Sequence, residues 1–179
     1  MTSVQIKDKH FELFIREEII IDKITRIAER INSDMTGKTP LFICVLNGVF
    51  MFAADLFKRI EIPCEITFVR LKSYQGAQTS GTVREIHGLT ESIENRNVII
   101  LEDIIDTGFT MRYLIDKLQI HKPASMKIAT LLFKPNALQT DITPDYAAIE
   151  IPNDFIVGYG LDYDGFGRNL RNIYKIKLC

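Results

Sequence analysis

The stretch Val98-Ile-Ile-Leu-Glu-Asp-Ile-Ile-Asp-Thr-Gly-Phe-Thr-Met111 predicts a strand, a tight turn and a helix in direct succession. Residues 98–101 form an apolar run that is rich in β-branched side chains and too short for a helix, which is typical of a strand buried on both faces. Such a strand lies centrally in a sheet. The turn that follows it precedes apolar residues at the spacing of one helical stripe, Met111, Leu114, Ile115 and Leu118. The turn is therefore a helix N-terminus.

Two carboxylates, Glu102 and Asp103, stand at the carboxyl end of this strand, where open α/β sheets keep their ligand crevice. Next comes a turn from Asp106 to Thr110 with a glycine and two hydroxyl side chains. Free N–H groups and the positive dipole end of a helix can hold a phosphate, whereas carboxylates repel one and need a hydroxylated or metal-bound partner. A sugar phosphate meets both demands, with its ribose hydroxyls, or a shared Mg²⁺, against Glu102 and Asp103. The stretch predicts a ribose-5-phosphate site.

This order of residues resembles the phosphoribosyl-pyrophosphate signature of type I phosphoribosyltransferases: an apolar strand, Glu-Asp, two apolar residues, then Asp-Thr-Gly-x-Thr. The competing interpretation is a solvated strand end and an ordinary strand-to-helix connection. The resemblance implies an α/β fold with a mostly parallel twisted sheet flanked by helices. It implies one domain over residues 1–179, with a small hood formed mainly from the C-terminal segment and the N-terminus. It also implies that Asp106 is the general base and that the substrate is bound by Glu102, Asp103, Ile105, Thr107, Gly108, Phe109 and Thr110.

The composition limits the functional classes. A chain of 179 residues with 46% hydrophobic residues can form one domain with a sizeable core. A net charge of −1 without basic runs argues against nucleic acid as a partner. No apolar stretch is long enough to cross a bilayer or act as a signal, so we expect no membrane partner and a cytoplasmic location. The three cysteines show no ligand-like pairing, which favours inert thiols in a reducing compartment.

The remaining elements alternate between strand and helix patterns, which predicts a mostly parallel sheet with helices on both faces. Isoleucines and an alanine between Ile20 and Ile31 recur at helical spacing, and a second helix is expected from Val49 to Arg59. The expected strands are Phe11–Phe14, Pro40–Val45, Cys64–Leu71, Ser125–Phe133, Tyr146–Ile149 and Phe155–Tyr159.

The turn Leu46-Asn47-Gly48 ends one expected strand, and Asn-Gly by itself is ordinary turn punctuation. In the resemblance it corresponds to the pyrophosphate loop, which often has Lys where this chain has Asn47. The resemblance also implies a cis peptide bond before Asn47 and a loop that acts through its backbone, because Asn47 carries no charge. The polar segment Ser73–Arg84 is either mobile surface or, as the resemblance of Ser73 and Tyr74 to the family's lid implies, a cover that keeps water from the reacting ribose.

The resemblance also assigns a purine site and a pyrophosphate site. Lys134 would donate to the exocyclic oxygen at C6, Phe155 would stack on the base, and Ile156 would meet it through its backbone. Each of these residues taken alone could equally be solvated or part of the core. In the C-terminal signature, Asp162 would bind magnesium with Glu102 and Asp103, and Arg168 would bind pyrophosphate. Many relatives have an aromatic residue before this arginine, where this chain has Gly167.

The resulting hypothesis is a Mg²⁺-dependent purine-salvage enzyme. It would transfer the 5-phosphoribosyl group of phosphoribosyl pyrophosphate to N9 of hypoxanthine or guanine, giving IMP or GMP and pyrophosphate. The family's enzymes are homodimers or homotetramers, and the apolar content permits such an interface. One alternative is an enzyme that prefers xanthine or guanine, because Lys134 serves all three oxopurines equally. The other is a regulatory protein that senses a nucleotide and binds nucleic acid, which should show a basic face.

Overall fold

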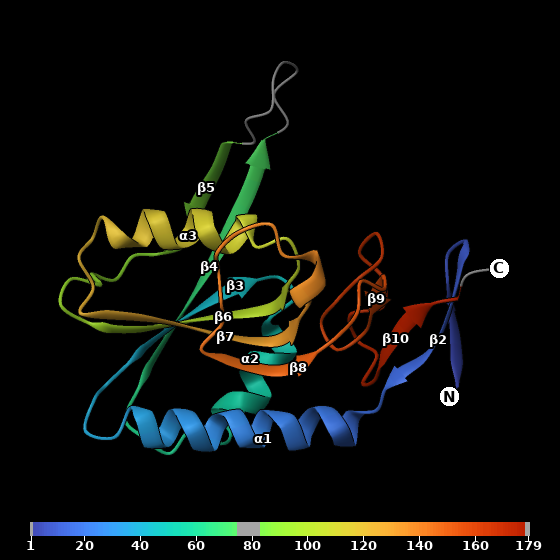
Figure 1. Ribbon diagram of the computed structural model, residues 1–179, viewed down its shortest axis with the longest axis horizontal. Coiled ribbons are helices and arrows are strands. Elements are labelled where there is room, and N and C mark those ends of the chain that lie inside the picture. The colour runs from blue at the N-terminus through green and yellow to red at the C-terminus, as the bar shows by residue number, and fades with distance from the viewer. Residues whose placement is uncertain (1, 75–82, 178–179) are drawn as a thin grey trace.

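The computed structural model describes residues 2–74 and 83–177, without side chains for residues 72–74 and 83–87. Figure 1 shows a larger α/β body with a smaller hood at one end. The elements in chain order are β1 (Ser3–Ile6), β2 (Lys9–Ile15), α1 (Glu17–Asp34), β3 (Leu41–Leu46), α2 (Phe50–Phe57), β4 (Glu65–Tyr74), β5 (Val83–His87), β6 (Asn97–Ile105), α3 (Phe109–Gln119), β7 (Ser125–Phe133), the 3-10 turn η1 (Pro135–Ala137), β8 (Tyr146–Glu150), β9 (Ile156–Val157) and β10 (Ile173–Ile176).

The body is a six-stranded sheet in the order β5-β4-β3-β6-β7-β8. Five of its strands are parallel, and β5 runs antiparallel to β4. After β3 the chain builds β4 on one side of it and then returns to place β6 on the other side. The order of the strands therefore reverses between β3 and β6, and their carboxyl ends form the crevice where open α/β sheets bind ligands.

The central strands bury both of their faces, as predicted for 98–101. Along β3, Phe42 and Cys44 pack into the cluster formed with α1 and α2, while Ile43 and Val45 pack into the cluster of α3. Figure 1 shows the corresponding layers, with α3 over one face of the sheet and α1 and α2 over the other. The predicted fold class is confirmed.

The hood is a second sheet, in the order β1-β2-β10-β9, and it joins the two ends of the chain. Its small core consists of Ile6, Phe11, Val157 and Tyr174. Among the described residues, hydrogen bonds to α1 and α2 attach it to the body. The Glu17 N–H at the start of α1 donates to the Asn172 side chain at 2.8 Å, and the buried Tyr159 hydroxyl donates to Asp55 of α2 at 2.5 Å.

Several strands differ from the expectations. The strand of the central motif continues past Leu101 to Ile105, because β6 stays paired with β7 up to Ile105 opposite Phe133. The polar segment expected from Ser73 to Arg84 begins and ends with strand residues of β4 and β5. The strand expected at Phe155–Tyr159 is reduced to β9, and β1 and β10 were not predicted. These hood strands are short. β1 pairs with β2 in a local hairpin, whereas β10 pairs with β2 across most of the chain, as Ile176 does with Phe11.

Candidate active site at the sheet switch point

The two central turns lie in contact at the switch point. The Leu46–Asn47 peptide bond is cis, as the resemblance implied. A Cβ built on Gly48 would lie 1.4 Å from Asp103 Oδ2, so the backbone of the first turn lies directly against the acid pair of β6. Gly160 of the hood, at φ +101°, packs on the other side, where its Cβ would lie 2.0 Å from the Gly48 carbonyl oxygen. Only glycine fits at either position.

Glu102 and Asp103 form a buried acid pair within β6. Glu102 is 9% exposed, and its Oε2 has no hydrogen-bond partner among the described residues. Burial, and secondly the charge of Asp103, raise the pKa of Glu102 well above its usual range. Burial also raises the pKa of Asp103, whose Oδ1 accepts the Ile104 N–H at 2.8 Å. The pair is thus poorly solvated and is suited to a partner that supplies hydroxyl donors or positive charge.

The turn Asp106–Thr110 leads into α3 through Gly108, which caps the helix in the left-handed conformation at φ +86°. With Glu102 and Asp103, it lines a pocket of about 290 Å³. The segment after β7 supports the turn from behind: the Gln139 N–H donates to the Thr107 carbonyl at 2.9 Å, and a Cβ on Gly108 would lie 2.1 Å from Thr140 Oγ1. A helix N-terminus held in this way presents its N–H groups to an anion.

Lys134 and Asp106 form an ion pair at 2.8 Å. The sheet register explains it, because Ile105 pairs with Phe133 and each charged residue follows the end of its strand. The Lys134 side chain is 9% exposed, while that of Asp106 is 48% exposed. A buried donor and an accessible carboxylate therefore stand side by side at the end of the sheet.

A second pocket of about 330 Å³ lies between the turn of β3 and the hood. Its walls include Asn47, Gly48, Glu102, Asp103, Thr110, Asp162 and Arg168. Arg168 Nη2 lies 2.5 Å from Asp162 Oδ1, and its Nη1 donates to the Gly160 carbonyl at 2.7 Å. The guanidinium is thus held at the wall of the pocket that the acid pair also lines, and its positive charge lowers the pKa of Asp103 against the larger effect of burial.

The structure explains the glycine that precedes this arginine. Gly167 has φ +96°, and a Cβ there would lie 2.7 Å from Ile6 Cδ1 of β1. The N-terminal strand therefore occupies the space beside Gly167, and Arg168 reaches the pocket without an aromatic neighbour at that position.

Comparison with known proteins decides the family. A model described as a phosphoribosyl transferase domain matches residues 15–164. The chain is 41% identical over 167 residues to a hypoxanthine-guanine phosphoribosyltransferase of Streptococcus thermophilus, with 93% of both chains covered. The chain belongs to the phosphoribosyl transferase family.

Solved structures agree with this assignment to the phosphoribosyl transferase family. A hypoxanthine phosphoribosyltransferase of Staphylococcus aureus has a TM-score of 0.87 and 39% identity, over 93% of this chain and 91% of that one. A Trypanosoma cruzi hypoxanthine phosphoribosyl transferase has a TM-score of 0.86 and 33% identity, over 97% and 95%. The predicted type I fold and the predicted enzyme class, a phosphoribosyltransferase of purine salvage, are confirmed.

Several predicted substrate residues of this phosphoribosyl transferase lie outside the two pockets. Lys134, Phe155, Ile156 and Phe109 line neither of them. Phe155 is 44% exposed in the hood, and Phe109 is 51% exposed at the first residue of α3. Ser73 and Tyr74 end β4, but their side chains, like residues 75–82, lie outside the described part of the chain.

The acid pair fits a magnesium ion that the protein shares with its substrate. Mg²⁺ is usually held by one or two carboxylates together with water and substrate phosphates. Among the described residues no group of three or more His, Cys, Asp and Glu forms a closed metal site. Glu102 has an unpaired buried oxygen, and Asp162, which accepts from Arg168 and from the Gly165 N–H, lines the same pocket as the acid pair. The ion would bind beside Glu102 and Asp103.

Sequence reasoning missed the residues that hold this site from behind. Gly160 and Thr140 contact the two turns, but their chain positions lie 112 and 32 residues away from Gly48 and Gly108 respectively. Short-range patterns do not carry such contacts. The one signal in the sequence for a close contact at Gly160 was its place in a glycine-rich stretch, which has four glycines from Gly158 to Gly167.

Proposed function

We propose that this enzyme transfers the 5-phosphoribosyl group of phosphoribosyl pyrophosphate to N9 of hypoxanthine or guanine. The observation that carries the proposal is the buried acid pair Glu102–Asp103, placed between a turn at a helix N-terminus and a turn that lies against Arg168. Ribose hydroxyls can donate to the acid pair while the 5-phosphate binds the N–H groups from Thr107 to Thr110.

Departure of pyrophosphate from C1 leaves positive charge on the ribose ring. The carboxylates of Glu102 and Asp103 favour that charge, and the Asn47 and Gly48 amides with Arg168 receive the leaving group. Asn47 carries no charge, so its turn would act through its backbone. A bound Mg²⁺, with Glu102, Asp103 and Asp162 as its proposed protein ligands, would neutralise the negative charge of pyrophosphate.

The Lys134–Asp106 ion pair supports the proposed base site. A bound 6-oxopurine can give each residue of the ion pair a new partner: its O6 accepts from Lys134, and its N7–H donates to Asp106. N9 bonds to C1 as Asp106 takes the proton from N7. Adenine presents an amino group instead of O6, and the ammonium of Lys134 cannot accept its hydrogens. Phe155 would stack on the base, the Ile156 backbone would meet its edge, and Ile105 and Phe109 would border the bound substrate.

We further propose that residues 1–179 act as one domain, with Ser73 and Tyr74 at the base of a cover over the site. A cytoplasmic location is supported by the free thiols of Cys44 and Cys64. None of the helices in the described residues is long and apolar enough to span a membrane.

The C-terminal region of the T. cruzi enzyme has a role in the oligomeric state of that enzyme.

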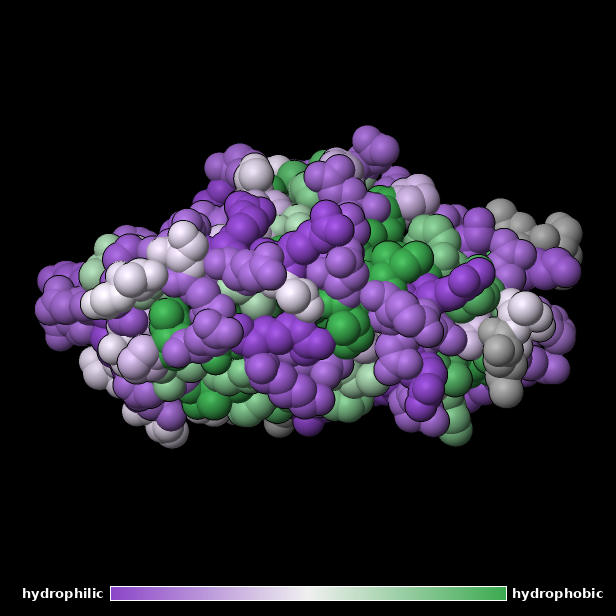
Figure 2. Space-filling model, turned by 90° about the horizontal axis from the view of Figure 1, so that it is seen from below, coloured by the Kyte–Doolittle hydropathy of each residue, from purple (hydrophilic) through white to green (hydrophobic). Residues whose placement is uncertain are grey.

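A homodimer or homotetramer is supported by half-exposed hydrophobic side chains on β4, α1 and α2, among them Phe68, Ile19 and Phe50. Figure 2 shows that the face carrying α1 is mostly hydrophilic, with separate hydrophobic patches. The net charge of −1 does not suggest nucleic acid as a partner.

Initial rates with hypoxanthine, guanine, xanthine and adenine, each with phosphoribosyl pyrophosphate and Mg²⁺, test the proposal. We expect turnover of hypoxanthine or guanine and little or none of adenine. A preference for xanthine would keep the reaction but change the assigned substrate, and no turnover of any oxopurine would refute the proposal.

A further inference from the structure

The ring proposed to stack on the purine rests on the N-terminal hairpin. Phe155 is fixed through its backbone, since its carbonyl accepts the Ile176 N–H at 2.8 Å, but its side chain is 44% exposed. Two rings support it: Phe11 of β2, with centroids 6.2 Å apart, and Tyr163, edge-on at 5.9 Å and 88°. The ammonium of Lys9 lies 5.7 Å from the Phe155 centroid.

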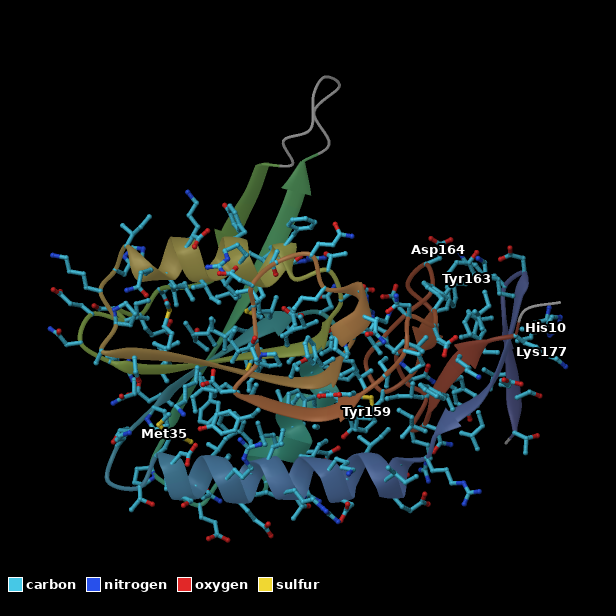
Figure 3. All side chains as sticks on the ribbon, in the orientation of Figure 1. His10, Met35, Tyr159, Tyr163, Asp164 and Lys177 are labelled. Atoms are coloured by element: carbon cyan, nitrogen blue, oxygen red, sulfur yellow. The ribbon has the colours of Figure 1, made fainter. Side chains whose placement is uncertain are left out.

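The supporting ring is itself held by the turn between β1 and β2. The Tyr163 hydroxyl donates to Asp8 Oδ1 at 2.9 Å, and this hydrogen bond is the largest cause that lowers the pKa of Asp8. The Lys9 ammonium lies 4.9 Å from the Tyr163 centroid. Figure 3 shows Tyr163 in the hood, at the same end of the molecule as His10. Asp8 of the turn thus binds the hydroxyl of Tyr163, and Lys9, the first residue of β2, contacts both rings.

We infer that Lys9 and Asp8 are positioning residues for the purine, which set the plane of the Phe155 ring through Tyr163 and through a direct cation–π contact. The inference rests on the proposed role of Phe155 as the stacking platform. It assigns the N-terminal turn a part in base binding that neither pocket reveals, because none of these residues lines either one.

The physical reason is the entropy of an exposed ring. A half-exposed phenyl group that can change rotamer loses that freedom when a base stacks on it, and this loss weakens binding. Contacts that hold the ring in one orientation before the base arrives remove the loss. A cation–π contact at an exposed site contributes about 0.5–1 kcal/mol, which corresponds to about two- to fivefold in an equilibrium constant.

The chain offers a matched control in the same turn. Lys7 pairs with Asp164 at 2.7 Å and lies 5.1 Å from the centroid of Phe166, so it joins the same two segments without touching Phe155 or Tyr163. Lys7→Met and Lys9→Met therefore make the same chemical change two residues apart. Only the second removes a contact to the proposed platform.

The experiment measures KM for hypoxanthine and for phosphoribosyl pyrophosphate, together with kcat, in Phe155→Leu, Lys9→Met, Lys7→Met and the double variant Lys9→Met/Phe155→Leu. We expect Phe155→Leu to raise KM for hypoxanthine roughly tenfold. Lys9→Met should raise it about two- to fivefold, with KM for the donor and kcat unchanged. Lys7→Met should change none of the three. In the Phe155→Leu background, Lys9→Met should have no further effect, because its action passes through the lost ring.

Asp8 supplies a second, conservative test. Asp8→Asn keeps an oxygen that accepts from the Tyr163 hydroxyl, so KM for hypoxanthine should stay near the wild-type value, while Asp8→Ala should raise it. If Phe155→Leu has no effect on KM for the base, the proposed base site is wrong, and the inference falls with it. If Phe155→Leu acts as expected but Lys9→Met matches Lys7→Met, the inference alone is overturned. An equal rise in both KM values for Lys9→Met also overturns it, since that indicates a general disturbance of the hood.

Discussion

The two strand-turn-helix units at the crevice, β3 to α2 and β6 to α3, share one plan but differ in how their turns contribute. The turn of the second unit has its own charged group, Asp106, and a left-handed glycine, Gly108, that opens the helix. The turn of the first has no charged side chain. Its glycine, Gly48, is required because Asp103 of the neighbouring strand occupies the space of a side chain.

Substitutions in the two turns should therefore impair the enzyme in different ways. A substitution in the second unit should remove an interaction that a reacting group makes. A side chain added in the first, whose turn would reach the substrate through its backbone, should act by displacing the acids of the second. The two kinds of effect can be told apart by kcat and by the KM values of the two substrates.

The largest effect is expected from Asp106→Asn. Loss of a general base typically costs about 10²- to 10⁴-fold in rate, so kcat should fall by that amount while KM for phosphoribosyl pyrophosphate stays near wild type. Steady-state kinetics with hypoxanthine measure both. Asp116→Asn removes an exposed carboxylate from α3 and serves as the control. Near-normal turnover of Asp106→Asn would contradict the assignment of the base.

Gly48→Ala should come next. The added Cβ would lie 1.4 Å from Asp103 Oδ2, so the acid or the turn must move. Displacement of a substrate-binding group by about 1 Å can cost roughly 10²-fold, and we expect a loss of that order in kcat/KM for phosphoribosyl pyrophosphate.

Gly37→Ala is the control for this prediction. Gly37 has φ +73° and nothing within 4 Å of a built Cβ, so alanine there carries backbone strain without a contact. It should cost about 1–2 kcal/mol of stability and leave kcat/KM unchanged. Similar activities for Gly37→Ala and Gly48→Ala would mean that the first turn does not act through Asp103.

The contrast between the two turns also explains which of them could be predicted from the sequence. The β6 unit was predicted from its own residues, because a buried strand, an acid pair and a glycine turn are local patterns. Asn47-Gly48 alone was indistinguishable from an ordinary turn, since the reason for its glycine lies 55 residues further on, in Asp103. The resemblance to a family supplied the missing information for this turn, including the cis bond.

The hood marks the other limit of sequence reasoning. Its strands β1 and β10 have four residues each, too few for a clear alternating pattern. The position of β10 depends on pairing with β2 across nearly the whole chain, for example Tyr174 with Leu13, whereas β1 pairs with β2 in a local hairpin. The contacts of Lys9 with Phe155 and Tyr163 follow from that pairing, and no local pattern in the first ten residues indicates them.

Lys134→Met tests the base side of the second unit. A hydrogen bond to a charged group contributes about 1.5–3 kcal/mol, so kcat/KM for hypoxanthine should fall about ten- to hundredfold. Activity with adenine should change little, which narrows the discrimination between the two bases. Lys127→Met is the matched control, because Lys127 lies on β7, the strand that Lys134 follows, and pairs with Asp34 and Asp145 instead. An unchanged ratio of hypoxanthine to adenine rates would exclude Lys134 as the donor to O6.

The smallest effect concerns the stability of the ligand-free enzyme. Burial and the charge of Asp103 raise the pKa of Glu102 in the folded state, so the folded protein binds a proton there more tightly than the unfolded chain does. The stability from this proton is fully present below the unfolded pKa of about 4.5 and is lost as pH rises through the folded pKa. For one such group the slope is at most about 1.4 kcal/mol per pH unit.

Glu102→Gln removes this titration and should flatten the fall in the free energy of unfolding between pH 5 and pH 8, measured by urea denaturation. Part of the slope should remain, because burial also raises the pKa of Asp103. Glu150→Gln, at the exposed end of β8, should leave the slope unchanged. Glu102→Gln should also bind phosphoribosyl pyrophosphate more weakly, since Glu102, the acid that destabilises the empty crevice, is proposed to face the ribose. An unchanged slope in Glu102→Gln would show that the acid is solvated in the empty enzyme, and the acid pair would then lose its role as the desolvated centre on which both turns converge.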